Sequence, residues 1–267
     1  MQSIMPSSPA SSDNSNSTDK AAALIGLRLN QALAQSGLCS RKAAARLISE
    51  QRVTVNGQQQ PHHYQVKNGD MILLDGKPLP EPAPLQYWLY HKPVGIDCNL
   101  NNKKDSLKHL LDSLPLRLFP LGRLDKDSCG LLLLSNDGAL TQQLMHPTFA
   151  HQKTYQVSVD KTLQDVMLQR LAQGLSYQVG PHQYQTLPCQ VQRLTEHSLQ
   201  ITLTQGLNRQ IRYMCREVGL KVQHLQRTHI NQLALGDLAE GQLRQLTQAE
   251  LQLLKGSLQS RTKPRAP

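Results

Sequence analysis

The sequence predicts an α+β protein in which a small domain precedes a larger one. At roughly 150 residues per domain, the 267 residues suggest one large domain or two unequal ones. A proline-rich segment at 80–84 would interrupt both helices and strands, so it separates two regions. In the second region, strand and helix patterns do not alternate regularly, which favours α+β over a doubly wound parallel sheet. The apolar fraction of 39% is enough for a packed core.

The small domain is expected to follow a polar tail. Residues 1–23 have low complexity and few apolar groups, so we expect them to be disordered. Helical spacing follows over 28–35, and Ser40 can cap a second helix with an apolar stripe that reaches Ile48. The segment 53–55 then indicates a strand.

Two turns complete the small domain. Asn56-Gly57 is typical of a tight hairpin turn, and Asn68-Gly-Asp70 precedes an apolar strand at 71–74. The expected organisation is a disordered tail at 1–23, a small domain at 24–80, a proline-rich linker at 81–85, a large domain at 86–255 and a basic tail at 256–267.

The large domain mixes both kinds of element. Strands are expected at 87–90, 131–134, 155–159 and 200–203. Leucines at helical spacing predict a helix over 107–114, and the apolar stripe of 211–218 predicts another that ends at Gly219. Thr247 and Glu250 form a capping box that begins the last helix.

The charge balance indicates a polyanionic partner. There are 29 Lys and Arg residues against 19 Asp and Glu, a net charge of +10. No strongly amphipathic basic helix dominates, so nucleic acid is favoured over a membrane surface. The longest apolar run, 131–134, is far shorter than the roughly 20 residues of a membrane span. We therefore expect a soluble intracellular protein.

Neither a metal nor a cofactor is expected. The five cysteines include no C-x-x-C pair, which argues against a zinc site or a disulfide framework. A P-loop and a dinucleotide fingerprint are also absent from the sequence.

The segment Gly122-Arg-Leu-Asp-Lys-Asp-Ser-Cys-Gly130 allows three interpretations. A calcium loop fails, because Cys129 and Asn136 occupy positions that require oxygen ligands and a closing Glu. A polar turn before a buried strand is common for such a composition. The third interpretation is a catalytic loop, in which Asp125 reacts and Arg123 contacts substrate or keeps the carboxylate ionised.

Three further groups have both a structural and a functional interpretation. Arg209, Arg212 and Arg216 form either a solvated helix face or a phosphate surface, and one of them could pair with Asp125. Tyr155 either packs in the core or stacks on a base. The small domain carries seven basic residues against three acidic ones, and this excess supports RNA or DNA binding. The candidate RNA-binding residues of this domain are Arg28, Arg41, Lys42 and Arg46.

Several motifs together resemble a known family. RLNQALAQSGLCSRKAAARLISEQRVTVNG resembles the S4 RNA-binding domain. HKPVG, GRLDKDSCGLLLLSNDG, HQKTYQV and QGLNRQIRYMCREVG, in this order, resemble the RsuA-type pseudouridine synthases of bacteria. The residues of these motifs are most similar to those of the RluF branch, and the RluB, RluE and RsuA branches share the core motifs. The resemblance covers roughly residues 27 to 253 and implies an S4 domain followed by a catalytic domain on a mixed, mainly antiparallel sheet.

The resemblance also implies roles for single residues. Asp125 matches the essential aspartate, Arg123 the arginine that holds the flipped-out nucleotide, and Tyr155 the tyrosine that stacks on the target uracil. Arg212 matches the basic residue that pairs with the aspartate. Lys153 and Arg209 match neighbouring motif positions with supporting roles. Tyr213 departs from the family, in which many members have a second arginine, and this removes one possible phosphate contact.

The implied function is the isomerisation of one uridine to pseudouridine in ribosomal RNA, with 23S RNA favoured. The substrate would be free RNA or a ribosome assembly intermediate, with tRNA as an alternative, and the enzyme a cytoplasmic bacterial monomer that needs no cofactor. Two other classes remain open from the residues alone. One is a non-catalytic S4-type RNA-binding protein, and the other is a glycosidase or nuclease that uses Asp125 and Asp127 as paired carboxylates.

Overall fold

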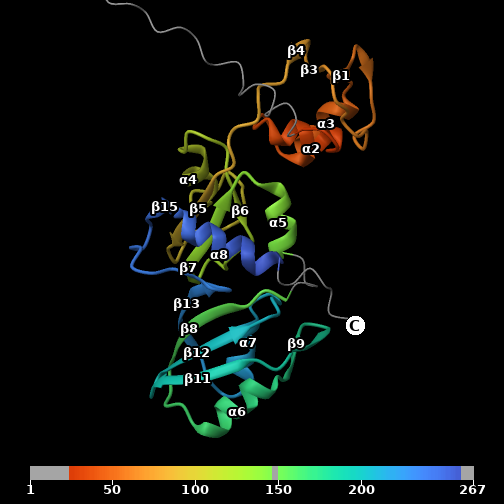
Figure 1. Ribbon diagram of the computed structural model, residues 1–267. Helices are drawn as coiled ribbons and strands as arrows, with labels where there is room; N and C mark the ends of the chain where they lie inside the picture. Colours follow the sequence, from red (N-terminus) through yellow and green to blue (C-terminus); the bar gives the residue numbers. More distant parts are fainter. Residues whose placement is uncertain (1–23, 146–149, 260–267) are drawn as a thin grey trace, which may run out of the picture. The chain divides into compact units, whose positions relative to one another are not determined.

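The computed structural model describes residues 24–145 and 150–259, which divide into two compact units (Figure 1). The first unit ends at Pro84 and the second begins at Leu85, inside the proline-rich segment. The expected polar tail at 1–23 lies outside the described residues. Within the described ranges, no helix is long and apolar enough to cross a membrane.

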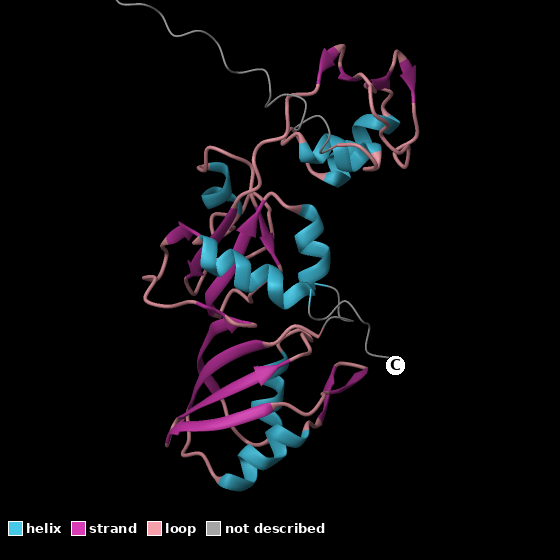
Figure 2. Cartoon of the chain, viewed as in Figure 1, coloured by secondary structure: helices cyan, strands magenta, loops and turns pink. Residues whose placement is uncertain are grey.

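In the first unit, two helices pack on a small sheet (Figure 2). The helices are α2 (Leu29–Gln35) and α3 (Arg41–Ser49). The backbone N–H of Ala43 donates to Ser40 Oγ at 3.2 Å, which confirms the expected N-cap of α3. The four strands run in the order β2-β1-β3-β4. Their bounds are β1 Val53–Val55, β2 Gln58–Gln59, β3 Ile72–Leu74 and β4 Lys77–Pro78.

The expected hairpin turn lies between β1 and β2. Val55 pairs with Gln58, and the two turn residues, Asn56 and Gly57, have φ angles of 53° and 78°. Two consecutive left-handed residues suit the right-handed twist of the flanking strands, and Asn-Gly adopts them at low cost.

The second unit is built on one nine-stranded sheet with the path β11-β12-β8-β13-β7-β5-β15, from which β14 pairs with β13 and β6 with β7. The strands are β5 Tyr87–Lys92, β6 Phe119–Leu121, β7 Cys129–Ser135, β8 Lys153–Val159, β11 Gln190–Thr195, β12 Ser198–Leu203, β13 Val222–Ile230, β14 Leu233–Ala234 and β15 Leu243–Gln245. A separate hairpin consists of β9 Ser176–Val179 and β10 His182–Gln185. Among these strands only β13 and β7 pair in parallel, so the expected mixed, mainly antiparallel sheet is confirmed.

In the described part of this unit, five helices accompany the sheet. Their bounds are α4 Lys108–Asp112, α5 Gly138–Met145, α6 Asp165–Gln173, α7 Gln210–Glu217 and α8 Gln248–Gln259. The apolar stripe of α7 is buried, and Gly219 follows with a φ of 82°, as expected for a helix end. Helix α8 continues to Gln259. The expected start of the basic tail, at residue 256, therefore falls inside this helix. Residues 260–267 lie outside the described part.

Strand β7 explains the apolar run at 131–134. Leu131 and Leu133 lie in one hydrophobic cluster with α5 and α8, whereas Leu132 and Leu134 lie in a second cluster with α4. Successive side chains of a strand point to opposite faces. Because both faces of β7 are covered, the run is apolar throughout.

A close contact that depends on a glycine joins β7 to β13. Gly130 pairs with Arg227 and has a φ of 108°. A Cβ at this position would lie 2.3 Å from the carbonyl oxygen of Arg227 and 2.6 Å from its nitrogen. Only glycine lets the two backbones approach this closely.

The predicted capping box of α8 is formed. The N–H of Thr247 donates to Glu250 Oε2 at 2.8 Å, and the N–H of Glu250 donates to Thr247 Oγ1 at 3.2 Å. Both terminal nitrogens of Arg244 also donate to the Glu250 carboxylate, each at 2.7 Å. These hydrogen bonds from Arg244 lower the pKa of Glu250 from 4.5 to about 2.

We expect Glu250→Gln to destabilise the protein in a pH-dependent way. The folded pKa lies below the unfolded one, so the carboxylate stabilises the fold above about pH 4.5 and loses this effect as the pH falls toward about 2. Since the pair is partly exposed, the loss at neutral pH should be at most about 1 kcal/mol. Urea unfolding of both proteins at about pH 7 and about pH 3 measures it. A difference that persists unchanged at low pH would contradict the expectation, and the exposed Glu196→Gln is the control.

Candidate active site

A cavity of about 1230 Å³ opens in the second unit. Its walls come from the loop 122–126, from strands β8 and β13, and from the segment 204–211 that leads into α7. It brings together most of the site residues expected from the sequence. Those that line it are Arg123, Asp125, Lys153, Tyr155 and Arg209, whereas Arg212 is not among the lining residues.

Asp125 is presented by a firmly held loop. The N–H of Ser128 donates to the Asp125 carbonyl at 3.1 Å, and the N–H of Gly95 donates to the Lys126 carbonyl at 2.7 Å. Lys126 in turn pairs with Asp105 at 2.6 Å. The half-buried Asp125 carboxylate itself has no hydrogen bond or ion pair to any described residue. The backbone of Asp125 is therefore fixed, and its carboxylate lines the cavity without a hydrogen-bond partner among the described residues.

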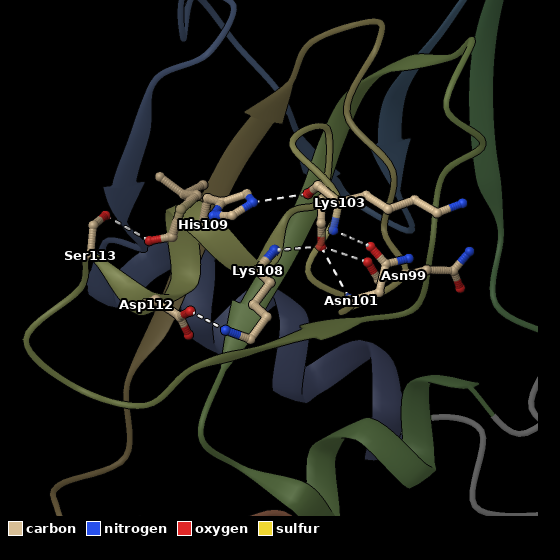
Figure 3. Close-up of polar contacts among 9 residues, drawn as sticks. Asn99, Asn101, Lys103, Lys108, His109, Asp112 and Ser113 are labelled. Carbon is tan, nitrogen blue, oxygen red and sulfur yellow. Dashed lines mark hydrogen bonds and ion pairs between the residues drawn. The ribbon is translucent and has the colours of Figure 1, made fainter.

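A polar loop forms one lip of this cavity. Within this loop Ser106 Oγ donates to the Asn99 carbonyl, and the ring of His109 in α4 contacts the Lys103 carbonyl at 2.9 Å (Figure 3). Asn99 Oδ1 also accepts a hydrogen bond of 3.3 Å from Nη1 of the exposed Arg123. The loop therefore holds the Arg123 side chain at the cavity entrance.

Tyr155 and Lys153 stand on the cavity face of β8. Tyr155 pairs with Ile201 on one side and with Arg227 on the other, and its half-buried ring packs against the clusters on both sides. Burial, with a smaller effect of the nearby Arg227, lowers the pKa of Lys153 to about 8. Among the described residues, the Lys153 Nζ donates one long hydrogen bond of 3.4 Å, to the His151 carbonyl.

Arg212 does not pair with Asp125 as expected. Its Nη2 donates to the Asp127 carbonyl at 2.6 Å and to Ser128 Oγ at 3.3 Å, and its Nε lies 3.3 Å from Asp127 Oδ2. Arg209 binds the same carboxylate with two nitrogens, at 2.9 and 2.7 Å. The partner of the two arginines is therefore the second aspartate of the loop. Arg212 binds Asp127 and not Asp125 because it lies against the end of the loop, where it supports the loop backbone.

The two arginines beside Asp127 keep its carboxylate ionised. Burial raises its pKa, but the hydrogen bonds from Arg209 and the charges of both arginines outweigh burial, so the pKa lies below its ordinary value. Arg209 itself precedes α7 with a left-handed φ of 51°. The bidentate pair offsets the cost of this unusual backbone conformation.

We expect Arg212→Gln to cost more stability than Arg209→Gln, although both remove a cation from Asp127. The Arg212 side chain is 14% exposed and carries backbone contacts, whereas that of Arg209 is 38% exposed. Losses of about 1–3 kcal/mol and of less than about 1 kcal/mol are expected, respectively. Urea unfolding of the two variants provides the comparison. Equal losses would show that Arg212 does not support the loop.

Arg216 lies away from these two arginines. Its guanidinium stacks on the Tyr213 ring at 4.9 Å, and its Nη2 donates to the Gln178 carbonyl at 3.2 Å. Tyr213 stacks on Tyr177 with ring centroids 5.1 Å apart. Tyr213, which departs from the family pattern, therefore has a packing role.

Comparisons with known proteins show the family to which this chain belongs. The family described as RNA pseudouridylate synthase matches residues 86–217, and the S4 domain family matches residues 27–72. The chain is 37% identical to the dual-specificity RNA pseudouridine synthase RluF of Shigella flexneri over 251 residues, which cover 90% of this chain and 83% of the relative. The chain belongs to the RNA pseudouridine synthase family.

Other relatives of this pseudouridine synthase give the same result. Ribosomal large subunit pseudouridine synthase B of Bacillus subtilis is 33% identical, with 85% of this chain and 95% of the relative covered. A solved crystal structure of a pseudouridylate synthase superposes with a TM-score of 0.62 at 28% identity, covering 85% of this chain and 99% of that chain. The expected enzyme class and the order of the two domains are confirmed.

The basic residues expected to bind RNA from the small domain lie in the S4 unit of the synthase. All four of these side chains are exposed: Arg28, Arg41, Lys42 and Arg46. Arg46 is 3.6 Å from Glu50. Because α3 buries Ala44 and Ile48 against the core, its basic residues face solvent, where an RNA backbone can reach them.

Sequence reasoning missed two buried cations of the synthase. Lys92 is fully buried, and its Nζ donates to the carbonyls of Pro93 and Ile96 at 2.7 and 2.8 Å. Arg227 lines the cavity and is 3% exposed. The HKPVG motif could have pointed to Lys92, whereas Arg227 lies in a polar segment that gives no such signal.

No metal site accompanies these groups in the part of the chain that the structure describes. These residues include no cluster of three His, Cys, Asp or Glu side chains that could hold an ion. The groups that line the cavity include the unpartnered Asp125 carboxylate, several cations and the Tyr155 ring. These groups suit the binding of an anionic nucleotide and acid–base or nucleophilic chemistry.

Proposed function

We propose that this RNA pseudouridine synthase converts a uridine of 23S ribosomal RNA to pseudouridine, with Asp125 as the essential carboxylate. The proposal rests on one observation, namely that the cavity holds the unpartnered Asp125 carboxylate together with the Tyr155 ring. An ionised carboxylate can attack C1′ of the ribose or remove the C2′ proton. An aromatic face next to it can stack on the uracil.

The target nucleotide has to leave its base stack, because a paired and stacked base cannot reach a carboxylate inside a cavity. Arg123 at the cavity entrance can bind the backbone of the flipped-out nucleotide, and the exposed arginines and lysine of the S4 unit can bind phosphates farther along the RNA. Arg209 and Arg212 support the loop through Asp127. Arg212 would thus position Asp125 indirectly, by holding the backbone of the loop.

The choice of large-subunit RNA is supported by the names of relatives. Pseudouridine synthase B of Bacillus subtilis is named for the ribosomal large subunit, and RluF of Shigella flexneri is named as a dual-specificity RNA enzyme. The latter name favours a second RNA substrate, for which tRNA is the candidate. We further propose that the synthase acts as a monomer in the cytoplasm, on free RNA or on an assembling ribosome.

A map of pseudouridine in total ribosomal RNA and tRNA tests this function. Cells that lack the gene should lose a site in 23S RNA, and the wild-type gene should restore it whereas Asp125→Asn should not. A map that does not change on deletion would overturn the proposed substrate. Restoration by Asp125→Asn would overturn the role of the aspartate.

A further inference from the structure

Arg227 lines the cavity together with Tyr155 and Lys153, the groups that would lie near the substrate base. It pairs with Tyr155 on one side and with Gly130 on the other. Residues paired across antiparallel strands point to the same face, so the Arg227 side chain shares the cavity face with Tyr155. Lys153 lies two residues before Tyr155 on the same face of β8 and also lines the cavity.

The bonds of Arg227 direct its guanidinium toward the loop that carries Asp125. Its Nε donates to the Leu131 carbonyl at 2.8 Å, and its Nη1 reaches the Arg123 carbonyl at 3.5 Å. The remaining nitrogen, Nη2, is buried and has no hydrogen-bond partner among the described residues. A buried donor without a partner, on a charged group, is costly to the folded protein.

No carboxylate within the described ranges forms an ion pair with Arg227 or Lys153. The other ion pairs near the loop use Asp105 and Asp127, which bind Lys126, Arg209 and Arg212. The buried Arg227 and the half-buried Lys153, which line the same cavity, therefore lack an anion among the described residues. A residue that reduces stability in the free protein is expected where a ligand supplies the missing interaction.

We propose that Arg227, with Lys153 beside it, binds the uracil ring of the target nucleotide and stabilises the negative charge that develops on this ring when it leaves the ribose. The inference rests on the proposed function and adds a catalytic group to it. The ligand is a carbonyl oxygen of uracil, O2 or O4. Asp125 acts on the sugar, while the two cations act on the base.

The reaction requires such a charge on either route. The N1–C1′ bond breaks and both electrons stay with the base, so the detached ring is an anion with charge on N1, O2 and O4. Asp125 either bonds to C1′ or takes the C2′ proton. When C5 bonds to C1′, the bond to Asp125 breaks, or the proton returns to C2′. C5 then loses a proton and N1 gains one, so the product is an isomer of the substrate.

Fixed donors placed where charge develops are worth about 100-fold to 1000-fold in rate each. We therefore expect Arg227→Gln to lower the single-turnover rate constant by about 100-fold, while the RNA dissociation constant stays within about threefold. Arg227→Lys, which keeps the charge but not the forked donors, should recover part of this loss. Lys153→Met should lower the rate constant in the same way, with little effect on binding.

The assay uses the full-length enzyme in excess over a 23S RNA fragment that contains the mapped site and carries tritium at C5 of uridine. Tritium leaves when C5 loses its hydrogen, after C5 has bonded to C1′, and filter binding of the same RNA gives the dissociation constant. Arg193→Gln and Lys161→Met are matched controls, because both side chains are bonded outside the cavity. If wild-type enzyme releases no tritium, the proposed function fails. If wild type is active and Arg227→Gln is within threefold of it, the inference alone fails.

A substrate with 5-fluorouridine at the target site separates this role from support of Asp125. Fluorine stabilises the departing uracil anion, so the defect of Arg227→Gln should shrink by about tenfold or more, measured as loss of 5-fluorouridine from the digested RNA. An unchanged defect, or a loss confined to RNA binding, would overturn the inference. If Arg227→Gln does not fold, as judged by its melting temperature, Lys153→Met is tested by the same criteria.

Discussion

Asp125→Asn should abolish pseudouridine formation and leave the fold intact. Asn is neither a nucleophile nor a base of comparable strength, so the rate should fall by at least about 1000-fold. The carboxylate has no partner among the described residues, and its removal should change the free energy of unfolding by no more than about 0.5 kcal/mol. This combination distinguishes a catalytic group from a structural one.

The measurement is tritium release from the target RNA together with urea unfolding of both proteins. Asp165→Asn is the matched control, because Asp165, the first residue of α6, accepts a hydrogen bond from Arg193 and does not line the cavity. Its activity should stay within about threefold of wild type. Residual activity of Asp125→Asn above a few per cent would rule out the assigned role.

Gly130→Ala should be among the most destabilising single substitutions in this chain. The new Cβ would lie 2.3 Å from the carbonyl oxygen of Arg227, and alanine would have to adopt a φ of 108°. Backbone strain and overpacking together should cost about 3–5 kcal/mol. The strands that separate are β7 and β13, so the cavity and the position of Arg227 would be lost together.

Urea unfolding of Gly130→Ala measures this cost, with Gly138→Ala as the control. Gly138 begins α5, and a Cβ there would meet no atom within 4 Å. Its replacement should change stability by no more than about 1 kcal/mol. A small effect at Gly130 would mean that β7 and β13 can separate without cost.

Local patterns predicted the elements whose burial is visible in their composition. The leucine run at 131–134 and the apolar stripe of α7 are buried as expected, and the caps at Ser40 and Thr247 are formed. These features depend on neighbours in the sequence. The period of the apolar residues and the type of the capping residue are sufficient to predict them.

Strand β13 could not be predicted in the same way. Its sequence, VQHLQRTHI, alternates irregularly, and bulges interrupt its pairing with β8 at two places. Its position between β8 and β7 depends on partners far away in the chain. Arg227 is buried only because of this placement, so its composition predicts exposure instead.

The candidate site was predictable as a set of residues but not as a set of contacts. The motifs identified Asp125, Tyr155, Arg123 and the arginines of α7, and most of these meet in one cavity. The choice of Asp127 as the partner of Arg212 depends on how the loop turns toward the end of α7. Two aspartates separated by one residue cannot be told apart by spacing alone.

The parallel pairing of β7 and β13 determines when the site can form during synthesis. Their paired residues, such as Gly130 and Arg227, are 97 positions apart in the chain, and β13 is the last long strand of the sheet to leave the ribosome. Until β13 is added, Tyr155 lacks its pairing partner Arg227, and the cavity beside the loop of Asp125 lacks one of its walls. A shortened chain that ends before β13 would retain the S4 unit and could still bind RNA, but it would lack the assembled cavity. Truncation would thus convert the enzyme into a competitor for its own substrate.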